Sequence, residues 1–533
     1  MMAAGQLKVW SLVVLALLAL GPLAGPVAAN GAVQGAEVTT ALGTVAGVTA
    51  EGVTSWKGLP YAAAPVGDLR WQPPAAPAVW QGTRDASAWP AACPQTVMTG
   101  QPAPATSEDC LYLNVWAPAQ RAATASLPVM VWIHGGGFRQ GSGQIEGEVL
   151  AKQGVVVVSI NHRLGPLGFF AHPALPKGDA NFGLLDMTAA LRWVRDHIGA
   201  FGGDPNNVTV FGVSAGGMAV QLLMVHPPAR GLFHKAIAQS GYGTWGVLRS
   251  ASAPEPAPLD MALDTVAPAS AEAAATDLVA RVTSAEQNRK TLMSLDAQAL
   301  AGAVVGFQLP IVDGSSLPEE PGILFERGAQ HAVPTIMGGN SFEGSVMPVS
   351  AISAETWSDW LGPRMAAVES VYASDFAVSR ELGVKRAFGD QRYLVAARLM
   401  ADAMGRVSAP AWLYYIDYLD PVNRATLPGS PHGADAVILF SGQAAADAET
   451  RAVAERLQSR WVTFARTGAP NPVGLTPWPA RPGRADASPA DPWLVIETEE
   501  RVAQGVIAER LDLLTEHYRA RLAPFAAPSE AKP

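Results

Sequence analysis

The sequence is poor in cysteine and in positive charge. Two cysteines in 533 residues exclude a disulfide-dense scaffold and a metal site built from four cysteines. Lysine and arginine number 37 against 46 aspartate and glutamate residues, a net charge of -9, so nucleic acid is not an expected partner. Apolar residues, in contrast, make up 49% of the chain. They supply material for a large core and exclude wholesale disorder.

Long hydrophobic runs are also scarce, and the one candidate lies at the N-terminus. An uncharged stretch, Val9–Ala29, follows Lys8, contains two prolines and ends in small residues. This layout predicts a secretory signal peptide over residues 1–29, cleaved after Ala29, and a mature protein that is secreted or periplasmic. An uncleaved anchor is the alternative, because the stretch is barely long enough to span a bilayer. No integral membrane span is expected after cleavage.

Export changes the interpretation of the two cysteines. In an oxidising compartment, Cys93 and Cys110 can form a disulfide. A loop of this size would stabilise the fold by about 3 kcal/mol if the bond is unstrained. Two buried free thiols are the alternative.

Short apolar runs alternate with segments of helical periodicity. This alternation predicts an α/β fold, in which helices cover both faces of a mostly parallel sheet. The expected strands begin at Leu127, Val155, Val208, Lys235, Pro334 and Ala411. Apolar residues recur at helical spacing over Met187–Ile198 and Val453–Phe464, so both segments are expected to be core-facing helices.

No clear domain boundary interrupts the chain. At about 150 residues per domain the length suggests three or four domains, yet the composition shifts only at 251–275 and at 476–492. We expect the first segment to be a flexible excursion and the second a surface connection, because neither is long enough to separate domains.

A candidate nucleophile lies between an expected strand and an expected helix. Gly212-Val213-Ser214-Ala215-Gly216 has the pattern GxSxG, in which small residues let a sharp turn close and lift the serine hydroxyl above the sheet. The alternative is a glycine-rich turn with an ordinary serine. A serine nucleophile also requires a base and donors for the oxyanion that it creates.

Donors for an oxyanion are available after the strand that begins at Leu127. His134-Gly135-Gly136-Gly137 matches the HGGG loop whose backbone N–H groups serve this purpose in esterases and lipases. A phosphate-binding loop is the competing interpretation, but the required GK[ST] does not follow.

The order of residues along the chain limits the candidates for the base. In this fold the acid and then the histidine follow the serine, which leaves His331, His432 and His517. His517 lies in a charged amphipathic segment, and His331 precedes a strand, which is the wrong end for a site at the carboxyl edge of a sheet. His432, in the turn-rich loop GSPHGAD, is therefore the expected base.

The expected acid is Glu343, which follows the strand PTIMGG and can orient an imidazole from the carboxyl end of that strand. Asp313 is the second candidate, and Asp417 and Asp420 are weaker ones.

Taken together, these motifs resemble the type B carboxylesterase and cholinesterase family of α/β-hydrolases. The resemblance extends over nearly all of the mature chain, and its longest motifs are rarely seen elsewhere. It is carried by WKGLPYAAAPVGDLRWQPP from Trp56, EDCLYLNVWAP from Glu108, WIHGGGF from Trp132, FGGDPNNVTVFGVSAGG from Phe201, GGNSFEGS from Gly338 and PHGAD from Pro431.

The resemblance implies an α/β-hydrolase fold with helical cap insertions and a single carboxylesterase domain over residues 30–533. It implies that Ser214 is the nucleophile, Glu343 the acid and His432 the base, with no metal or organic cofactor. The oxyanion hole is then formed by three backbone N–H groups, those of Gly136, Gly137 and Ala215. Cys93 and Cys110 match the family's first disulfide. Two structural ion pairs are also implied, Arg70 with Glu108 and Arg163 with Asp186.

The sequence departs from the cholinesterases at two places that serve a quaternary ammonium group. Val213 stands where those enzymes carry a glutamate, and the segment between the cysteines contains no tryptophan. A choline ester is therefore not the expected substrate, since no cation–π platform is evident.

The expected function is hydrolysis of small to medium organic esters through an acyl-enzyme. An amidase or carbamate hydrolase, or a lipase, would use the same site, and a non-catalytic binding module is the alternative outside enzymes. Residues 241–326 and 341–410 are expected to cap the site. Within them, Trp245, Trp357 and Trp360 either line the site or pack in the core.

Overall fold

The structure is a computed structural model that describes residues 33–97, 103–122, 124–253, 270–441, 447–481 and 491–522. The expected signal peptide over 1–29 lies outside these residues, as does most of both segments of shifted composition. Within the described ranges, no helix is both long enough and apolar enough to cross a bilayer.

The strands are β1 (Val33–Thr40), β2 (Gly43–Ala50), β3 (Val53–Pro60), β4 (Thr83–Asp85), β5 (Tyr112–Pro118), β6 (Leu127–Ile133), β7 (Val156–Ile160), β8 (Gly203–Val213), β9 (Lys235–Gln239), β10 (Leu248–Arg249), β11 (Ile311–Val312), β12 (Thr335–Asn340), β13 (Ala411–Ile416), β14 (Pro492–Ile496) and β15 (Glu500–Gln504).

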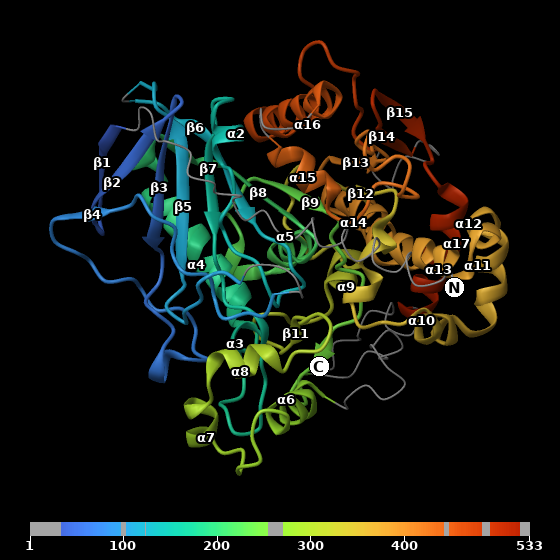
Figure 1. Ribbon diagram of the computed structural model, residues 1–533, viewed down its shortest axis with the longest axis horizontal. Coiled ribbons are helices and arrows are strands. Elements are labelled where there is room, and N and C mark those ends of the chain that lie inside the picture. Colours follow the sequence, from blue (N-terminus) through green and yellow to red (C-terminus); the bar gives the residue numbers. More distant parts are fainter. Residues whose placement is uncertain are drawn as a thin grey trace, which may run out of the picture.

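One large sheet runs through the molecule in the order β1-β2-β3-β5-β7-β6-β8-β9-β12-β13-β14-β15, with β4 paired to β2. The pairs from β7 across to β14 are parallel, whereas β1-β2-β3-β5-β7 and β14-β15 are antiparallel. All six strands expected from the sequence are present, and they are the adjacent block β7-β6-β8-β9-β12-β13. Figure 1 shows this sheet crossing the molecule from the blue N-terminal strands to the red β15.

The α-helices are α2 (Glu148–Ala151), α3 (Gly165–Gly168), α4 (Phe182–His197), α5 (Ala215–Val225), α6 (Ala271–Ala280), α7 (Arg289–Ser294), α8 (Ala297–Gly302), α9 (Pro321–Glu326), α10 (Ala354–Leu361), α11 (Met365–Val371), α12 (Ala373–Val378), α13 (Arg380–Gly389), α14 (Val395–Met404), α15 (Ala434–Phe440), α16 (Ala448–Thr467) and α17 (Ala508–Leu522). The short helical turns are η1 (Gly67–Leu69), η2 (Ile198–Phe201), η3 (Pro227–Ala229), η4 (Glu343–Val349), η5 (Gly362–Arg364), η6 (Asp390–Leu394) and η7 (Gly405–Val407).

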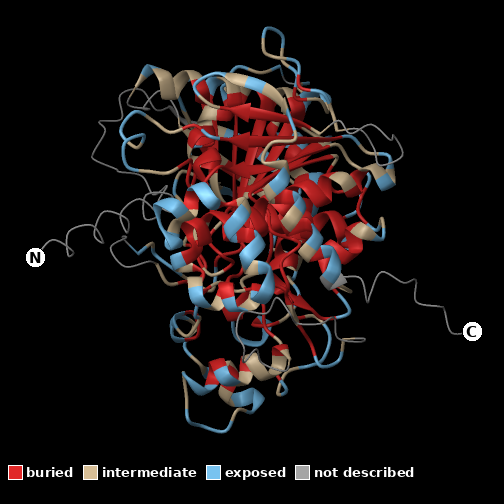
Figure 2. Ribbon diagram, turned by 90° about the vertical axis from the view of Figure 1, so that its right-hand side faces the viewer, coloured by how far each residue is buried: buried red, intermediate tan, exposed pale blue. Residues whose placement is uncertain are grey.

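The central strands are continuously apolar because both faces of the sheet are covered. Along β6, Val129, Val131 and Ile133 pack with residues of α4, α5 and α14 in one hydrophobic cluster. Met130 and Trp132, which alternate with them, pack with residues of α2, α15 and α16 in another. Successive side chains of a strand point to opposite faces, so each run must be apolar throughout. Figure 2 shows the resulting interior, with buried strands inside and exposed surface on the outer helices.

A disulfide joins Cys93 and Cys110, whose Cα atoms are 5.1 Å apart. Both cysteines are buried. The loop that the bond closes leads directly into β5, next to the antiparallel part of the sheet. The bond therefore restricts the long segment that connects β4 to β5.

Replacing both cysteines by serine is expected to lower the free energy of unfolding by about 3 kcal/mol, because the unfolded chain regains the freedom of the closed loop. Urea unfolding monitored by circular dichroism measures this change. A reducing agent should shift the unfolding midpoint of the unsubstituted protein in the same direction and leave the double variant unaffected. Equal midpoints for the two proteins without reductant would contradict the expectation.

Candidate active site

Ser214 occupies the turn between the end of β8 and the start of α5. Its backbone is in an unusual conformation, with φ 57° and ψ -119°, which a non-glycine residue adopts only when its surroundings enforce it. The Ser214 N–H donates to the Gln239 carbonyl at the end of β9, 2.9 Å away. A side chain at Gly216 would approach the Ile133 carbonyl oxygen to 2.1 Å, so only glycine lets the helix start this close to β6.

His432 reaches Ser214 from the loop between β13 and α15. Its Nε2 atom lies 2.8 Å from the Ser214 Oγ. The backbone N–H of His432 donates to Ser345 Oγ at 2.9 Å, and the Tyr393 ring lies 4.5 Å from the imidazole. These contacts hold the imidazole against the hydroxyl, the position from which a base takes the proton of a serine.

Glu343 lies behind His432, at the first residue of η4, and is fully buried. Its Oε2 contacts the Nδ1 atom of His432. The other oxygen, Oε1, accepts hydrogen bonds from Ser240 Oγ at 2.6 Å, from the Asn340 N–H at 2.7 Å and from Asn340 Nδ2 at 3.0 Å. A buried carboxylate needs such donors, and here they also fix which oxygen faces the imidazole.

The HGGG loop follows β6 at the same edge of the sheet. Gly136 and Gly137 have φ values of 113° and 63°, which is the left-handed region that glycine adopts without strain. The backbone N–H groups of Gly136, Gly137 and Ala215 have no acceptor among the described residues. Ala215 is the first residue of α5, where unpaired N–H groups and the helix dipole favour negative charge.

The other candidates from the sequence lie elsewhere. His331 is buried before β12, and burial lowers its pKa to about 4. His517 packs edge-on against a tryptophan of α10. Asp313, just after β11, accepts hydrogen bonds from Asn181, the residue before α4, and from its neighbours. Asp420 accepts hydrogen bonds from backbone N–H groups within its own turn. Asp417 is exposed. The structure thus brings Ser214 and Glu343 together with His432 alone.

A cavity of about 430 Å³ opens above Ser214 and His432. Its walls come from the HGGG loop and from both expected cap segments, which contribute Phe307 and the stretch from Val346 to Ala351. A second cavity of about 350 Å³ shares Phe307 and Ala351 with the first.

The three tryptophans of the cap segments do not line the cavity above Ser214. Trp245 packs against Phe388 and the Arg392 guanidinium, and Trp357 is buried with its indole N–H on Gln391. The Trp360 ring lies tilted against that of Trp245, with the two centroids 6.4 Å apart. Their aromatic area therefore serves the core of the cap, which is the packing alternative that the sequence left open.

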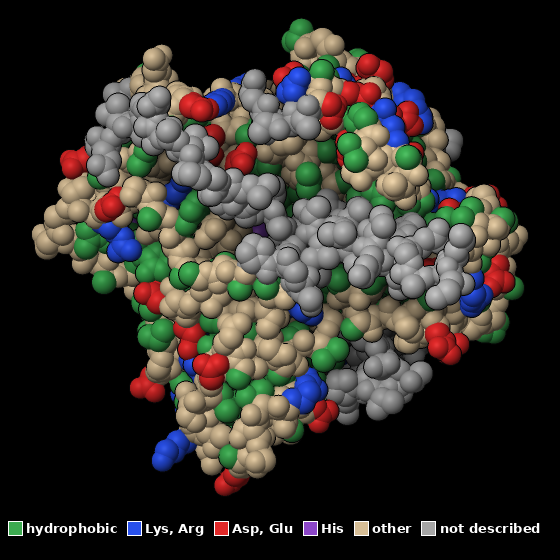
Figure 3. Space-filling view, in the orientation of Figure 1, with side chains coloured by type: hydrophobic (Ala, Val, Ile, Leu, Met, Phe, Trp, Pro, Cys, Tyr) green, Lys and Arg blue, Asp and Glu red, His purple; other side chains and the backbone are tan. Residues whose placement is uncertain are grey.

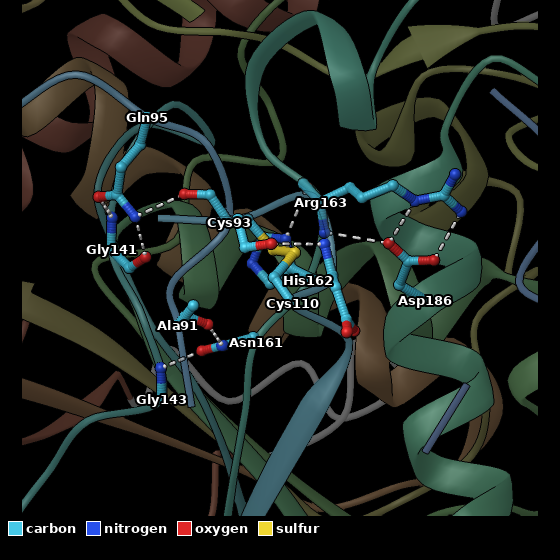
Figure 4. Close-up of a disulfide and its surroundings, with 12 residues drawn as sticks. Ala91, Cys93, Gln95, Cys110, Gly141, Gly143, Asn161, His162, Arg163 and Asp186 are labelled. Carbon is cyan, nitrogen blue, oxygen red and sulfur yellow. Dashed lines mark hydrogen bonds and ion pairs between the residues drawn. A yellow bond between two sulfur atoms is a disulfide. The ribbon is translucent and has the colours of Figure 1, made fainter. Parts of the chain in front are cut away.

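The disulfide loop is connected to the turn after the HGGG loop through Gln95. Its Nε2 donates to the Gly141 carbonyl at 2.9 Å and its Oε1 accepts from the Gly141 N–H at 2.8 Å. Figure 4 shows this amide between Cys93 and Gly141.

Both ion pairs that the resemblance implies are present in the structure. Arg163 lies 2.7 Å from Asp186, and both side chains are buried. Arg70 is hydrogen-bonded to Glu108.

The histidine that begins the HGGG loop is stacked on a second histidine. The rings of His134 and His162 are 4.6 Å apart and nearly parallel. Burial, with the neighbouring imidazole as a second cause, lowers the pKa of His134 to about 3, and burial lowers the pKa of His162 to about 4. Both rings are therefore neutral at pH 7 and give the loop no positive charge.

Comparison with known proteins decides the family. A sequence model described as the carboxylesterase family matches residues 34–514. The chain belongs to the carboxylesterase family. It is 36% identical over 488 residues to a fumonisin B1 esterase of Sphingopyxis macrogoltabida, an alignment that covers 86% of this chain and 87% of that protein. It is 37% identical over 476 residues to a para-nitrobenzyl esterase of Bacillus subtilis (strain 168), with coverage of 83% and 92%.

Solved structures agree with this assignment. A PNB esterase superposes with a TM-score of 0.73 at 33% identity, covering 90% of this chain and 99% of that one. A carboxylesterase of Geobacillus stearothermophilus superposes with a TM-score of 0.74 at 29% identity and the same coverage. The fold is accordingly that of the α/β-hydrolases, and the reaction of this carboxylesterase is the hydrolysis of carboxylic esters.

Sequence reasoning missed the residues that hold Glu343 in this carboxylesterase. Ser240 directly follows β9, and Asn340 ends β12, the neighbouring parallel strand. Polar residues at the carboxyl ends of two adjacent parallel strands are the signal that could have found them. Gln95, in contrast, lies in a loop whose path only the folded chain reveals.

Replacing Gln95 by alanine is expected to lower kcat about 10-fold, because the turn after the HGGG loop loses both of its hydrogen bonds to the Gln95 side chain and the oxyanion donors lose their fixed position. Steady-state kinetics with a 4-nitrophenyl ester measures this effect. Gln81→Ala, at an exposed glutamine that does not line the cavity above Ser214, is the control. An unchanged kcat with Gln95→Ala would contradict this role.

His134→Gln and His162→Gln are expected to make stability less sensitive to acid. Each histidine binds a proton near pH 6.5 when the chain is unfolded but near pH 3 or 4 when it is folded. Its contribution is therefore present above pH 6.5 and is lost as the pH falls towards 4, at about 1.4 kcal/mol per pH unit.

Urea unfolding at several values between pH 7 and pH 4.5 measures the slope for each protein. Asp390, whose pKa burial raises to about 6, contributes with the opposite sign in all three proteins and cancels in the difference. Identical slopes for the variants and the unsubstituted protein would show that the two histidines are not held neutral by the fold.

Proposed function

We propose that this carboxylesterase acts through Ser214, His432 and Glu343, by way of an acyl-enzyme, on small to medium organic esters. The observation that carries the proposal is the unbroken series of contacts from the buried Glu343 carboxylate through both nitrogens of His432 to the Ser214 hydroxyl. Such a series combines a nucleophile, its base and a group that orients the base.

In the first half of the proposed reaction, the Ser214 Oγ attacks the ester carbonyl while His432 Nε2 takes its proton. Glu343 orients the imidazole and stabilises its cationic form. The charge that develops on the carbonyl oxygen is received by the N–H groups of Gly136, Gly137 and Ala215. Each such donor contributes roughly 3 to 4 kcal/mol at the barrier.

The alcohol then leaves with the proton from His432, which completes the first half and leaves the acyl group on Ser214. In the second half, water gives a proton to the same imidazole and attacks the acyl-enzyme, and the Ser214 Oγ takes that proton back as the acid is released. These steps use side chains, backbone amides and water.

The cavity supports a limited range of substrate sizes. Its volume of about 430 Å³ suits a drug-sized or smaller molecule. Among its described lining residues there is no tryptophan and no carboxylate, and the one aromatic ring, that of Phe307, already lies 5.0 Å from the Arg392 guanidinium. A quaternary ammonium ester would therefore find no counter-charge and no free cation–π platform among these residues. This supports the choice of uncharged or anionic esters over choline esters.

We also propose that the enzyme is exported and catalyses this reaction in a secreted or periplasmic location. The N-terminal pattern of residues 1–29 predicts a cleaved signal peptide, and a disulfide between Cys93 and Cys110 suits an oxidising compartment. We also propose that residues 30–533 act as one domain.

Ser214→Ala is expected to lower kcat/KM for 4-nitrophenyl acetate at least about 1,000-fold, since no other described group can form the acyl-enzyme at this position. An organophosphate should label Ser214, and peptide mapping by mass spectrometry locates the adduct. Ser284→Ala, at an exposed serine, is the control and should behave as the unsubstituted protein. Labelling of another residue, or a Ser214→Ala rate equal to that of the control, would refute the proposal.

A further inference from the structure

Arg139 lines the cavity above Ser214, two residues after the end of the HGGG loop at Gly137. One of its guanidinium nitrogens, Nη1, donates to the Gly306 carbonyl in the cap, 2.6 Å away. That single bond spans the mouth of the site from the loop to the cap. It leaves most of the five N–H groups of the guanidinium available to a molecule in the cavity.

The charge of Arg139 is not balanced by the protein. Within the described residues, no carboxylate lies within ion-pair distance of it, whereas the buried guanidinium groups of Arg70, Arg163 and Arg460 each face a carboxylate. Burial is the cause that shifts the pKa of Arg139 downwards. A half-buried arginine remains protonated, so the cavity contains a positive charge that has no ion-pair partner in the described part of the chain.

Gln140 adds a second unused polar group. Its side chain lines the same cavity, the residue is only 7% exposed, and its Oε1 has no hydrogen-bond partner in the described chain. The backbone N–H groups of Arg139 and Gln140 both donate to the Gly136 carbonyl, so this pair of side chains is held in a fixed turn beside the expected oxyanion donors. Because an amide oxygen only accepts hydrogen bonds, the Gln140 Oε1 would pair with a donor of a ligand and not with a carboxylate; what Gln140 contributes is the fixed turn that it shares with Arg139.

The remainder of the cavity contains nothing that would repel an anion. Its other described lining residues are apolar, apart from Ser214 and His432. The chain as a whole is acidic, with 46 aspartate and glutamate residues against 37 lysine and arginine residues. On the face seen in Figure 3, basic and acidic side chains are interspersed and form no broad basic patch.

We propose that Arg139 makes this enzyme selective for esters that carry an ionised carboxylate in addition to the ester group. Arginine pairs with carboxylates through two parallel hydrogen bonds, and their attraction is stronger in a partly enclosed site than in open water. The inference rests on the proposed function of Ser214. The carboxylate belongs either to the acyl part or to the alcohol part of the substrate, and the experiment separates these two sources.

Two pairs of esters, matched except for charge, test the proposal. The acyl pair is 4-nitrophenyl hydrogen adipate and 4-nitrophenyl methyl adipate. The alcohol pair is 4-acetoxybenzoate and its methyl ester. For each pair, kcat/KM of the anionic ester is divided by kcat/KM of the neutral ester. This ratio cancels any general loss of activity that follows from disturbing the bond to Gly306.

In at least one pair, Arg139→Gln is expected to reduce the ratio about 10- to 100-fold, the value of a hydrogen-bonded charge pair. Arg139→Lys should retain part of the preference because it keeps the charge. Arg121→Gln is the matched control, since Arg121 is also half-buried, also donates to a single described carbonyl and lies outside the cavity. Its ratio should equal that of the unsubstituted protein.

Inhibition of the unsubstituted protein by a dicarboxylate tests the same proposal. Adipate should inhibit hydrolysis of the neutral esters by the unsubstituted protein competitively and more strongly than dimethyl adipate does, and added salt should weaken this inhibition. If Arg139→Gln leaves the ratio unchanged in both pairs while Ser214→Ala abolishes hydrolysis, the selectivity proposal is wrong and the proposed function stands. If Ser214→Ala hydrolyses the esters as the unsubstituted protein does, the proposed function fails and this inference fails with it.

Discussion

The buried carboxylate of Glu343 is the group on which the rest of the site depends. A fully buried charge is tolerated only when donors surround it, and its donors come from Ser240 after β9 and Asn340 at the end of β12. Those two residues meet because β9 and β12 are parallel neighbours in register. The order of the central strands therefore determines the position of the acid, then the orientation of His432, and finally the contact with Ser214.

The central part of this arrangement can be predicted from the sequence. Runs buried on both faces, such as β6 and β7, are recognisable because they are apolar throughout, and parallel strands place their carboxyl ends at one edge. Serine, acid and histidine could then be placed by their positions after such strands. The strands β2 and β4 cannot be recognised in this way, because buried or half-buried positions alternate irregularly with exposed ones and their partners are set by long-range pairing. The sequence also could not decide whether the tryptophans of the cap segments line the site or pack in the core, because indole rings suit a pocket and a core equally well.

The first hundred residues contribute to the site by an indirect route. The disulfide restricts the loop that contains Gln95, and both polar atoms of the Gln95 amide bond to the Gly141 backbone. Stacking of His134 on His162 packs the first residue of the HGGG loop against the segment after β7 without adding charge. Backbone donors can stabilise an oxyanion only if they are already in position before the reaction. The N-terminal part of the chain thus supplies rigidity to a site whose reactive side chains come from later segments.

The three side chains of the proposed catalytic triad are far apart along the chain: Ser214 and His432 are 218 positions apart, and Glu343 and His432 are 89 positions apart. Contacts of such high sequence separation form only after long loops have closed. On the proposed mechanism, a fragment that ends before the loop after β13 lacks the base and has no activity. Appearance of esterase activity would then report that these three segments have come together, so that this step of refolding can be timed by substrate turnover instead of by a spectroscopic probe.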